Sequence, residues 1–236
     1  MVAFDLKKDM LQWFVSTFGK DVLLYTADAL QHQWSRLFKT RTILILGPKQ
    51  AGKSTLLQFM RSGQPYEVVG DELRTPAPTA MAAVVDQKFA ADKKNWLRLK
   101  RDVPGDLDLR DTWAQAIADV KPHGIIYLLD GRRSDEQLRA DVQDIVPHVL
   151  VHYAESLGHL AALHVFVNFC DGWGSGAPEQ RRRLRLVRDE LEDLVTATPS
   201  CAALRLDVAA TQLSPNLQAW PEVERALRHF GADIAL

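Results

Sequence analysis

The sequence predicts an α/β fold of three layers, in which helices cover both faces of a mostly parallel central sheet. Two observations lead to this prediction. Short, continuously apolar runs, which are typical of strands buried on both faces, alternate with stretches of helical periodicity. A glycine-rich turn also joins the first of these runs to a helix, and such a turn places backbone N–H groups where a phosphate can bind.

Composition limits the classes of function. The chain has 236 residues with a formal net charge of −1, so a broad basic face for nucleic acid is not expected. It has two cysteines, no recognisable targeting signal and no run of 18 apolar residues. Val2 excludes N-myristoylation. We therefore expect a cytoplasmic protein that does not associate with membranes without a partner. The sequence does not indicate its oligomeric state.

The first strand follows a change of hydrophobic period. Residues 1–40 carry apolar side chains every three or four positions, which predicts an N-terminal helical extension ahead of a domain over 41–236. Residues 42–46 then form a short apolar run, which predicts a buried strand. Good helix formers over 54–61 predict the helix after the turn.

The later elements are predicted in the same way. Residues 62–80 hold three prolines and two glycines and are expected to form a long loop. The strand at 96–101 is more basic than a central buried strand, so we expect it near an edge or incompletely covered. Further strands are expected at 83–89, 124–129, 163–167 and 204–208, and helices at 110–121, 135–156, 178–196 and 219–230.

A phosphate-binding loop is the most specific motif. The turn after the first strand fits G-x-x-x-x-G-K-[ST], in which backbone N–H groups surround a β-phosphate, the lysine reaches the β- and γ-phosphates and the serine hydroxyl holds Mg²⁺. The fold class is therefore expected to be the P-loop NTPase fold. The predicted phosphate-binding residues are Gly47, Pro48, Lys49, Gln50, Ala51, Gly52, Lys53, Ser54 and Thr55.

Two aspartates are candidates for the second carboxylate that such a loop needs for Mg²⁺. Asp102 begins a D-x-x-G pattern that ends at Gly105. Asp130 ends the apolar strand at 124–129, as a metal-binding aspartate of an ATPase does. These two positions predict different enzymes, a GTPase and an ATPase or phosphotransferase.

The segment after the apolar strand at 163–167 favours guanine. Asn168 and Asp171 form an N-x-x-D pattern directly after residues 163–167, which places a carboxylate at the sheet edge where nucleotides bind. A carboxylate can accept two hydrogen bonds from the N1–H and N2–H₂ groups of guanine, whereas adenine has no such paired donors. Asp171 therefore predicts GTP.

In the order of these motifs, residues 41–236 resemble the Ras-like small GTPases, most of all the ADP-ribosylation-factor-like branch. Residues Pro78 and Thr79 are similar to the switch I Pro-Thr of that branch, and Asp102–Gly105 to switch II. Residues 168–171 are similar to the N-K-x-D guanine motif, and Ala209-Ala210-Thr211 to the last guanine loop. With the phosphate-binding loop, five motifs occur in the family's order.

The resemblance implies a role for each matching residue. Mg²⁺ is bound by Ser54, Thr79 and Asp102. The N–H of Gly105 contacts the γ-phosphate, Asn168 joins the base loop to the phosphate loop, and the Ala210 N–H contacts the guanine oxygen. The expected catalytic positions are Lys53, Thr79 and Asp106, and the expected base-side residues are Asn168, Phe169, Asp171, Ala210 and Thr211.

Two departures from the family pattern affect function. Asp106 stands where the family usually has the glutamine that orients the attacking water. An ionised carboxylate cannot donate a hydrogen bond and is repelled by the γ-phosphate, which predicts either slow hydrolysis or an attacking water positioned by another group. Phe169 replaces the lysine that packs along guanine, and its ring can stack there instead.

The resulting hypothesis is a small GTPase-type molecular switch that binds GTP or GDP with Mg²⁺. A protein partner is expected to recognise residues 62–80 and 102–112, together with the N-terminal helices. Two alternatives remain, an ATPase or phosphotransferase that uses Asp130, and a guanine-nucleotide-binding module without hydrolysis.

Overall fold

The computed structural model describes eight parts of the chain, all within the compact unit Thr40–Leu236. These parts are residues 40–62, 83–90, 96–103, 105, 111–151, 160–173, 178–213 and 220–235. The helices predicted within residues 1–40 and nearly all of the loop predicted at 62–80 lie outside them, as do Thr79 and Asp106.

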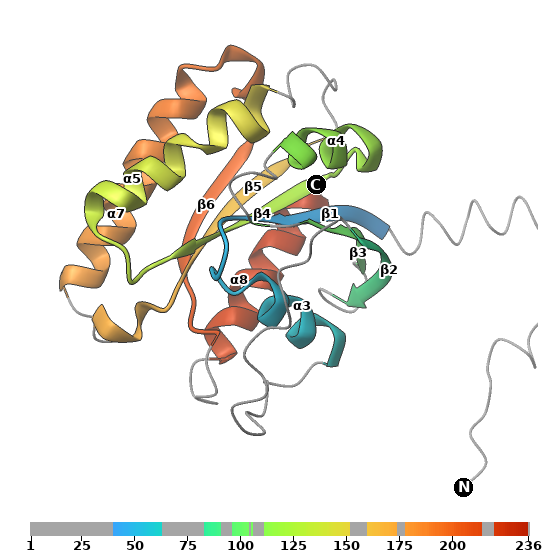
Figure 1. Ribbon diagram of the computed structural model, residues 1–236, viewed down its shortest axis with the longest axis horizontal. Coiled ribbons are helices and arrows are strands. Elements are labelled where there is room, and N and C mark those ends of the chain that lie inside the picture. The colour runs from blue at the N-terminus through green and yellow to red at the C-terminus, as the bar shows by residue number, and fades with distance from the viewer. Residues whose placement is uncertain are drawn as a thin grey trace, which may run out of the picture. The chain divides into compact units, whose positions relative to one another are not determined.

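A six-stranded sheet forms the centre, in the order β2-β3-β1-β4-β5-β6 (Figure 1). Five strands run parallel, and β2 pairs antiparallel with β3 at one edge. The basic strand β3 thus lies next to the edge, as its composition suggested. The strands are β1 (Thr40–Leu46), β2 (Ala83–Ala90), β3 (Trp96–Asp102), β4 (Gly124–Asp130), β5 (Ala162–Asn168) and β6 (Arg205–Ala210).

Both faces of the central strands are buried, which is why their sequences are continuously apolar. In β4, Ile125 and Tyr127 belong to one hydrophobic core, while Ile126 and Leu128 belong to a second core. Side chains alternate between the faces of a strand, so the two cores lie on opposite faces of the sheet. This arrangement confirms the prediction of a three-layer fold with a mostly parallel sheet.

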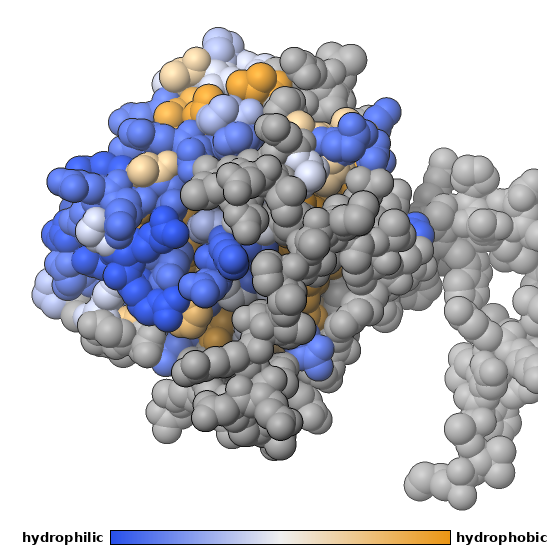
Figure 2. All heavy atoms as spheres, viewed as in Figure 1, coloured by the Kyte–Doolittle hydropathy of each residue, from blue (hydrophilic) through white to orange (hydrophobic). Residues whose placement is uncertain are grey.

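Each core is closed by its own helices (Figure 1). Apolar residues of α3 (Lys53–Ser62) and α8 (Trp220–Ala235) line one core. The other core is lined by α4 (Asp111–Val120), α5 (Asp135–Gln143) and α7 (Pro178–Thr196). The outer surface over α5 and α7 is strongly hydrophilic in Figure 2. None of the helices in the described ranges has the length and apolar character needed to cross a bilayer.

The helix predicted over 135–156 differs from the structure. Ser134 caps α5 with a capping box, but α5 ends at Gln143 and a π-helical segment follows over Val146–Leu150. Pro147 explains the change, because proline has no N–H group with which to continue the α-helical hydrogen bonds. Two short 3₁₀ segments, η4 (Cys170–Trp173) and η5 (Pro199–Cys201), follow β5 and α7.

Candidate functional site

The predicted nucleotide-binding segments lie at one edge of the sheet. The strands β1, β4, β5 and β6 are parallel, so their carboxyl ends face the same way, and Asp130 is paired in register with Asn168. The glycine-rich turn follows β1, the segment 168–173 begins at the end of β5, and Thr211 follows β6. This edge is where open α/β sheets bind ligands.

The turn after β1 has the backbone shape of a phosphate cradle. Gly47, Gln50 and Gly52 have φ angles of 135°, 65° and 102°. A Cβ atom on Gly47 would lie 2.2 Å from the carbonyl oxygen of Leu128, so only glycine fits where the turn crosses β4. When residues in right-handed and left-handed backbone conformations follow one another, their N–H groups point toward one spot. Such a concave group of N–H donors binds anions.

The helix α3, which follows this turn, begins with Lys53 and Ser54. The ammonium of Lys53 donates 2.8 Å hydrogen bonds to the carbonyl oxygens of Gly47 and Pro48, and it thereby lies over the turn. The side chain of Ser54 is exposed at the start of α3. Ala51 is fully buried, whereas Lys49 and Gln50 are exposed.

Gly105 brings the predicted switch II segment against the same cradle. A Cβ atom on Gly105 would lie 2.1 Å from the Lys53 ammonium nitrogen and 2.6 Å from the carbonyl oxygen of Gly47. The backbone at residue 105 therefore lies so close to Lys53 that only glycine fits there without a shift of its neighbours. Gly105 and Lys53 are both predicted to contact the γ-phosphate, and the structure places them next to each other.

Asn168 joins the phosphate loop to the segment after β6. Its side chain is fully buried, donates a 3.0 Å hydrogen bond to Ala51 and accepts a 2.8 Å hydrogen bond from the Leu213 N–H. The Thr211 N–H donates to the carbonyl oxygen of Val167 at 2.8 Å, and Thr211 is itself buried. Three segments that are distant in sequence are thus held together at the predicted base and phosphate subsites.

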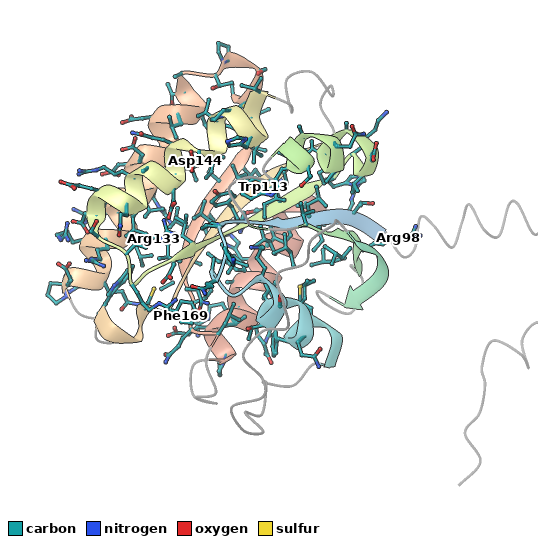
Figure 3. All side chains as sticks on the ribbon, viewed as in Figure 1. Arg98, Trp113, Arg133, Asp144 and Phe169 are labelled. Carbon is teal, nitrogen blue, oxygen red and sulfur yellow. The ribbon has the colours of Figure 1, made fainter. Side chains whose placement is uncertain are left out.

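Phe169 follows Asn168 in a left-handed backbone conformation, with φ at 60°. The guanidinium of Arg132 lies 4.0 Å from the centre of the Phe169 ring, which is a cation–π contact. Figure 3 shows Phe169 near the N-terminal ends of α5 and α7. The Arg132 side chain contributes nothing to the sequence motifs, and it was not predicted to belong to the site.

The carboxylate of Asp130 is bound by the same arginine. It accepts hydrogen bonds from the Arg132 backbone N–H at 3.0 Å and from Nε and Nη2 of the guanidinium at 2.9 and 2.7 Å. Burial by itself would raise the pKa of Asp130, but these hydrogen bonds lower it below its ordinary value. These hydrogen bonds fix the orientation of the Arg132 side chain, which is a structural role for Asp130.

An arginine of α7 joins the turn after β4 to η4, the segment after β5. The guanidinium of Arg183 lies 5.1 Å from the centre of the Trp173 ring and donates to the carbonyl oxygens of Gly131 and Arg133. Trp173 Nε1 donates to the Gly131 oxygen at 2.9 Å. Part of the arginine-rich sequence at 181–188 therefore holds the turn after β4 and the segment after β5 together.

The remaining predicted residues are described in part. The backbone of Asp102 ends β3, and the backbone of Asp171 lies within η4, while their side chains lie outside the described atoms. Ala210 is the last residue of β6, and Thr55 lies in the first turn of α3. The oxygen chemistry of Ser54, Thr79 and Asp102 suits Mg²⁺, which prefers hard oxygen ligands.

Comparisons with known proteins show the fold. The sequence matches no protein-family model and no curated protein. Among solved structures, the chain resembles the mammalian SRP receptor with a TM-score of 0.55 and 15% identity, over 80% of this chain and 100% of that chain. It resembles the Arl6 (BBS3) small GTPase of Trypanosoma brucei, bound to a nucleotide analogue, with a TM-score of 0.50 and 13% identity, over 82% and 99% of the two chains.

A third similar structure is a GTP-binding protein of the archaeon Sulfolobus solfataricus in complex with GDP. The TM-score is 0.50 at 12% identity, over 94% of this chain and 61% of that chain. Two of these three structures are, by name, a small GTPase and a GTP-binding protein. Within the described residues, the chain has the fold of the small GTPases.

Proposed function

We propose that the chain is a guanine-nucleotide switch, which binds GTP and GDP with Mg²⁺ and hydrolyses GTP slowly. The observation that carries the proposal is the pair of hydrogen bonds made by Asn168. They hold the phosphate loop, the base segment and the segment after β6 as one preorganised edge. The fold shared with small GTPases and the guanine-type N-x-x-D pattern support the same assignment.

The described residues suit the binding of a polyphosphate. Backbone N–H groups of the loop and the Lys53 ammonium offset the charge of the β- and γ-phosphates, and phosphoryl transfer depends mainly on such positioning and charge. Ser54, Thr79 and Asp102 would hold Mg²⁺, which supplies further charge neutralisation at the phosphate oxygens. Binding of a γ-phosphate would compete for the Lys53 ammonium that now bonds to Gly47 and Pro48.

Gly105 provides a means of distinguishing GTP from GDP. Its backbone lies against Lys53 and Gly47. The γ-phosphate of GTP, which GDP lacks, would therefore move the backbone at residue 105. Small GTPase-type switches act through such loops, which are ordered by the γ-phosphate and released after hydrolysis. We propose that a protein partner recognises residues 62–80 and 102–112 in one of the two states.

The ATPase alternative assigns the metal to Asp130. Three hydrogen bonds from Arg132 already engage that carboxylate, so metal binding would have to displace a bidentate guanidinium. The GTPase proposal predicts that Asp102→Ala abolishes Mg²⁺-dependent nucleotide affinity, while Asp130→Ala lowers it less than tenfold. The opposite ranking in a fluorescent-nucleotide displacement assay would favour the ATPase.

Base selection tests the proposal directly. Asp171→Asn replaces the carboxylate by an amide, which presents one acceptor and one donor to the N1–H and N2–H₂ groups of guanine. We expect GTP affinity to fall at least tenfold and affinity for xanthosine triphosphate to rise. Asp189→Asn, on the exposed part of α7, is the matched control and should change neither affinity. Equal GTP affinity in wild type and Asp171→Asn would refute the base assignment.

A further inference from the structure

A second cluster of polar side chains lies at the opposite end of β5 from the nucleotide edge. His164 of β5 faces His229 and Asp233 of α8, and the metal-ligating atoms of these three residues all lie within 4.8 Å of one another. His164 precedes Asn168 by four residues, a separation of about 13 Å along a strand. The cluster is therefore separate from the nucleotide site.

Both distances from the Asp233 carboxylate to the histidine nitrogens suit a tetrahedral metal ion. His164 Nε2 lies 2.9 Å from Asp233 Oδ2, and His229 Nε2 lies 3.7 Å from the same oxygen. Two ligands bound to Zn²⁺ at its usual distances, with a tetrahedral angle between them, are about 3.3 Å apart. The two observed distances bracket this value, and all three ligand atoms lie within 4.8 Å of one another.

Asp207 orients the second histidine for metal binding. His229 Nδ1 lies 3.0 Å from Asp207 Oδ2, and the other carboxylate oxygen of Asp207 accepts a 2.9 Å hydrogen bond from Arg188. A histidine that binds metal through one ring nitrogen commonly donates its other N–H to a carboxylate, which fixes the tautomer and the ring orientation. Asp207 thus leaves Nε2 of His229 for a metal ion.

Burial gives the cluster a closed base and an open side. The side chain of His164 is 1% exposed and that of Asp233 19% exposed, whereas that of His229 is 56% exposed. Burial lowers the pKa of His164 below its ordinary value despite the neighbouring Asp233. Solvent can reach the cluster beside His229 and supply a fourth ligand.

We propose that His164 Nε2, His229 Nε2 and Asp233 Oδ2 form a binding site for Zn²⁺ or a similar divalent transition metal ion, with water as the fourth ligand. Two nitrogen ligands and one carboxylate are a typical donor set for such ions. His229 and Asp233 are four residues apart and share one face of α8, so a bound ion ties that helix to β5. The metal site stabilises the packing of α8 on the sheet.

The experiment is a calorimetric titration of the full-length, untagged protein with Zn²⁺ in excess Mg²⁺, so that the nucleotide edge does not compete. We expect one equivalent to bind in the micromolar range or tighter, and His229→Ala to weaken it at least 100-fold. Asp207→Asn should weaken binding about 10–100-fold. His148→Ala is the control, because His148 packs against Trp113 outside this cluster and should leave affinity unchanged.

Co²⁺ gives an independent readout. A tetrahedral Co²⁺ complex absorbs in the visible range, and we expect this absorption in wild type and His148→Ala but not in His229→Ala. At a Zn²⁺ concentration that saturates wild type but not His229→Ala, the melting temperature of wild type should rise by about 5 °C and that of His229→Ala should change much less. Equal Zn²⁺ affinity in wild type and His229→Ala, or no binding tighter than millimolar, would overturn the proposal and leave a hydrogen-bonded His164–Asp233 pair.

Discussion

The side chain of Asn168 donates a 3.0 Å hydrogen bond to the carbonyl oxygen of Ala51, across 117 residues of sequence. The same amide accepts a hydrogen bond from Leu213, so one buried side chain links the phosphate loop with two segments on the base side. Because all three segments meet at this amide, the stability of the site depends on it.

Asn168→Ala should lower the free energy of unfolding by about 2–4 kcal/mol. The substitution leaves two buried backbone groups, at Ala51 and Leu213, without partners, and each costs about 1–3 kcal/mol. Denaturation in urea measures the change. The control is Gln143→Ala, whose exposed hydrogen bond to Glu190 should contribute less than 1 kcal/mol. A loss below 1 kcal/mol for Asn168→Ala would show that the link is dispensable.

Gly105→Ala should lower GTP affinity more than tenfold. The added methyl group meets the Lys53 ammonium at 2.1 Å and two backbone atoms below 3 Å, so lysine and loop must both shift. Binding is measured with a fluorescent GTP analogue. Gly124→Ala is the matched control, because its methyl group meets Phe230 and Ile234 instead and should lower stability without changing nucleotide affinity. Equal effects of the two variants on affinity would contradict this interpretation of residue 105.

Phe169→Ala should weaken GTP and GDP equally, by about 1–2 kcal/mol. Stacking of a base on an aromatic ring contributes on this scale, and it does not depend on the number of phosphates. Calorimetry with both nucleotides measures the loss. Arg132→Ala removes the cation–π contact but keeps the ring, so its effect should be smaller. If Phe169→Ala left the affinities for GTP and GDP unchanged, the purine would not stack on this ring.

Asp106→Gln should increase the rate of GTP hydrolysis in a single-turnover assay. Glutamine removes the negative charge near the γ-phosphate and restores a donor that can orient water. Asp106→Ala is the control, since it removes the charge without restoring the donor and should accelerate hydrolysis less. A rate for Asp106→Gln equal to or below that of wild type would argue against this role.

Acid should weaken the ion pairs at the start of α7, where Glu179 pairs with Arg182 and Arg183. Hydrogen bonds from Arg182 and Arg183 lower the pKa of Glu179 from 4.5 to about 2. A depressed carboxyl pKa adds stability above pH 4.5 that is lost as the pH falls toward 2. Arg182→Ala should therefore show a smaller fall in melting temperature between about pH 5 and pH 3 than wild type at low salt. Arg181→Ala, also exposed on α7, should match wild type.

The layers of the fold could be predicted because strands that are buried on both faces have continuously apolar sequences. The runs at 42–46 and 124–129 are continuously apolar, and both became central strands. The helix at 178–196 was predicted with the bounds that the structure has, since its apolar residues recur at helical spacing. The interruption after Gln143 is marked in the sequence by Pro147 alone.

The contacts around the site could not be predicted, because they join side chains that no local pattern relates. Arg132 lies over the ring of Phe169, and only the pairing of β4 with β5 brings these two residues together. The positive φ of Phe169 is also unexpected for a residue with a large side chain. His164 and Asp233 are likewise 69 residues apart and meet only when α8 packs on the sheet.

The most direct test of the central claim is calorimetric titration of the nucleotide-free protein with GTP, GDP and ATP in the presence of Mg²⁺. The proposed edge, with its phosphate cradle at 47–54 and its base segment at 168–171, predicts binding of GTP and GDP at least 100-fold tighter than binding of ATP. Equal or tighter binding of ATP, or no uptake of any guanine nucleotide, would contradict it.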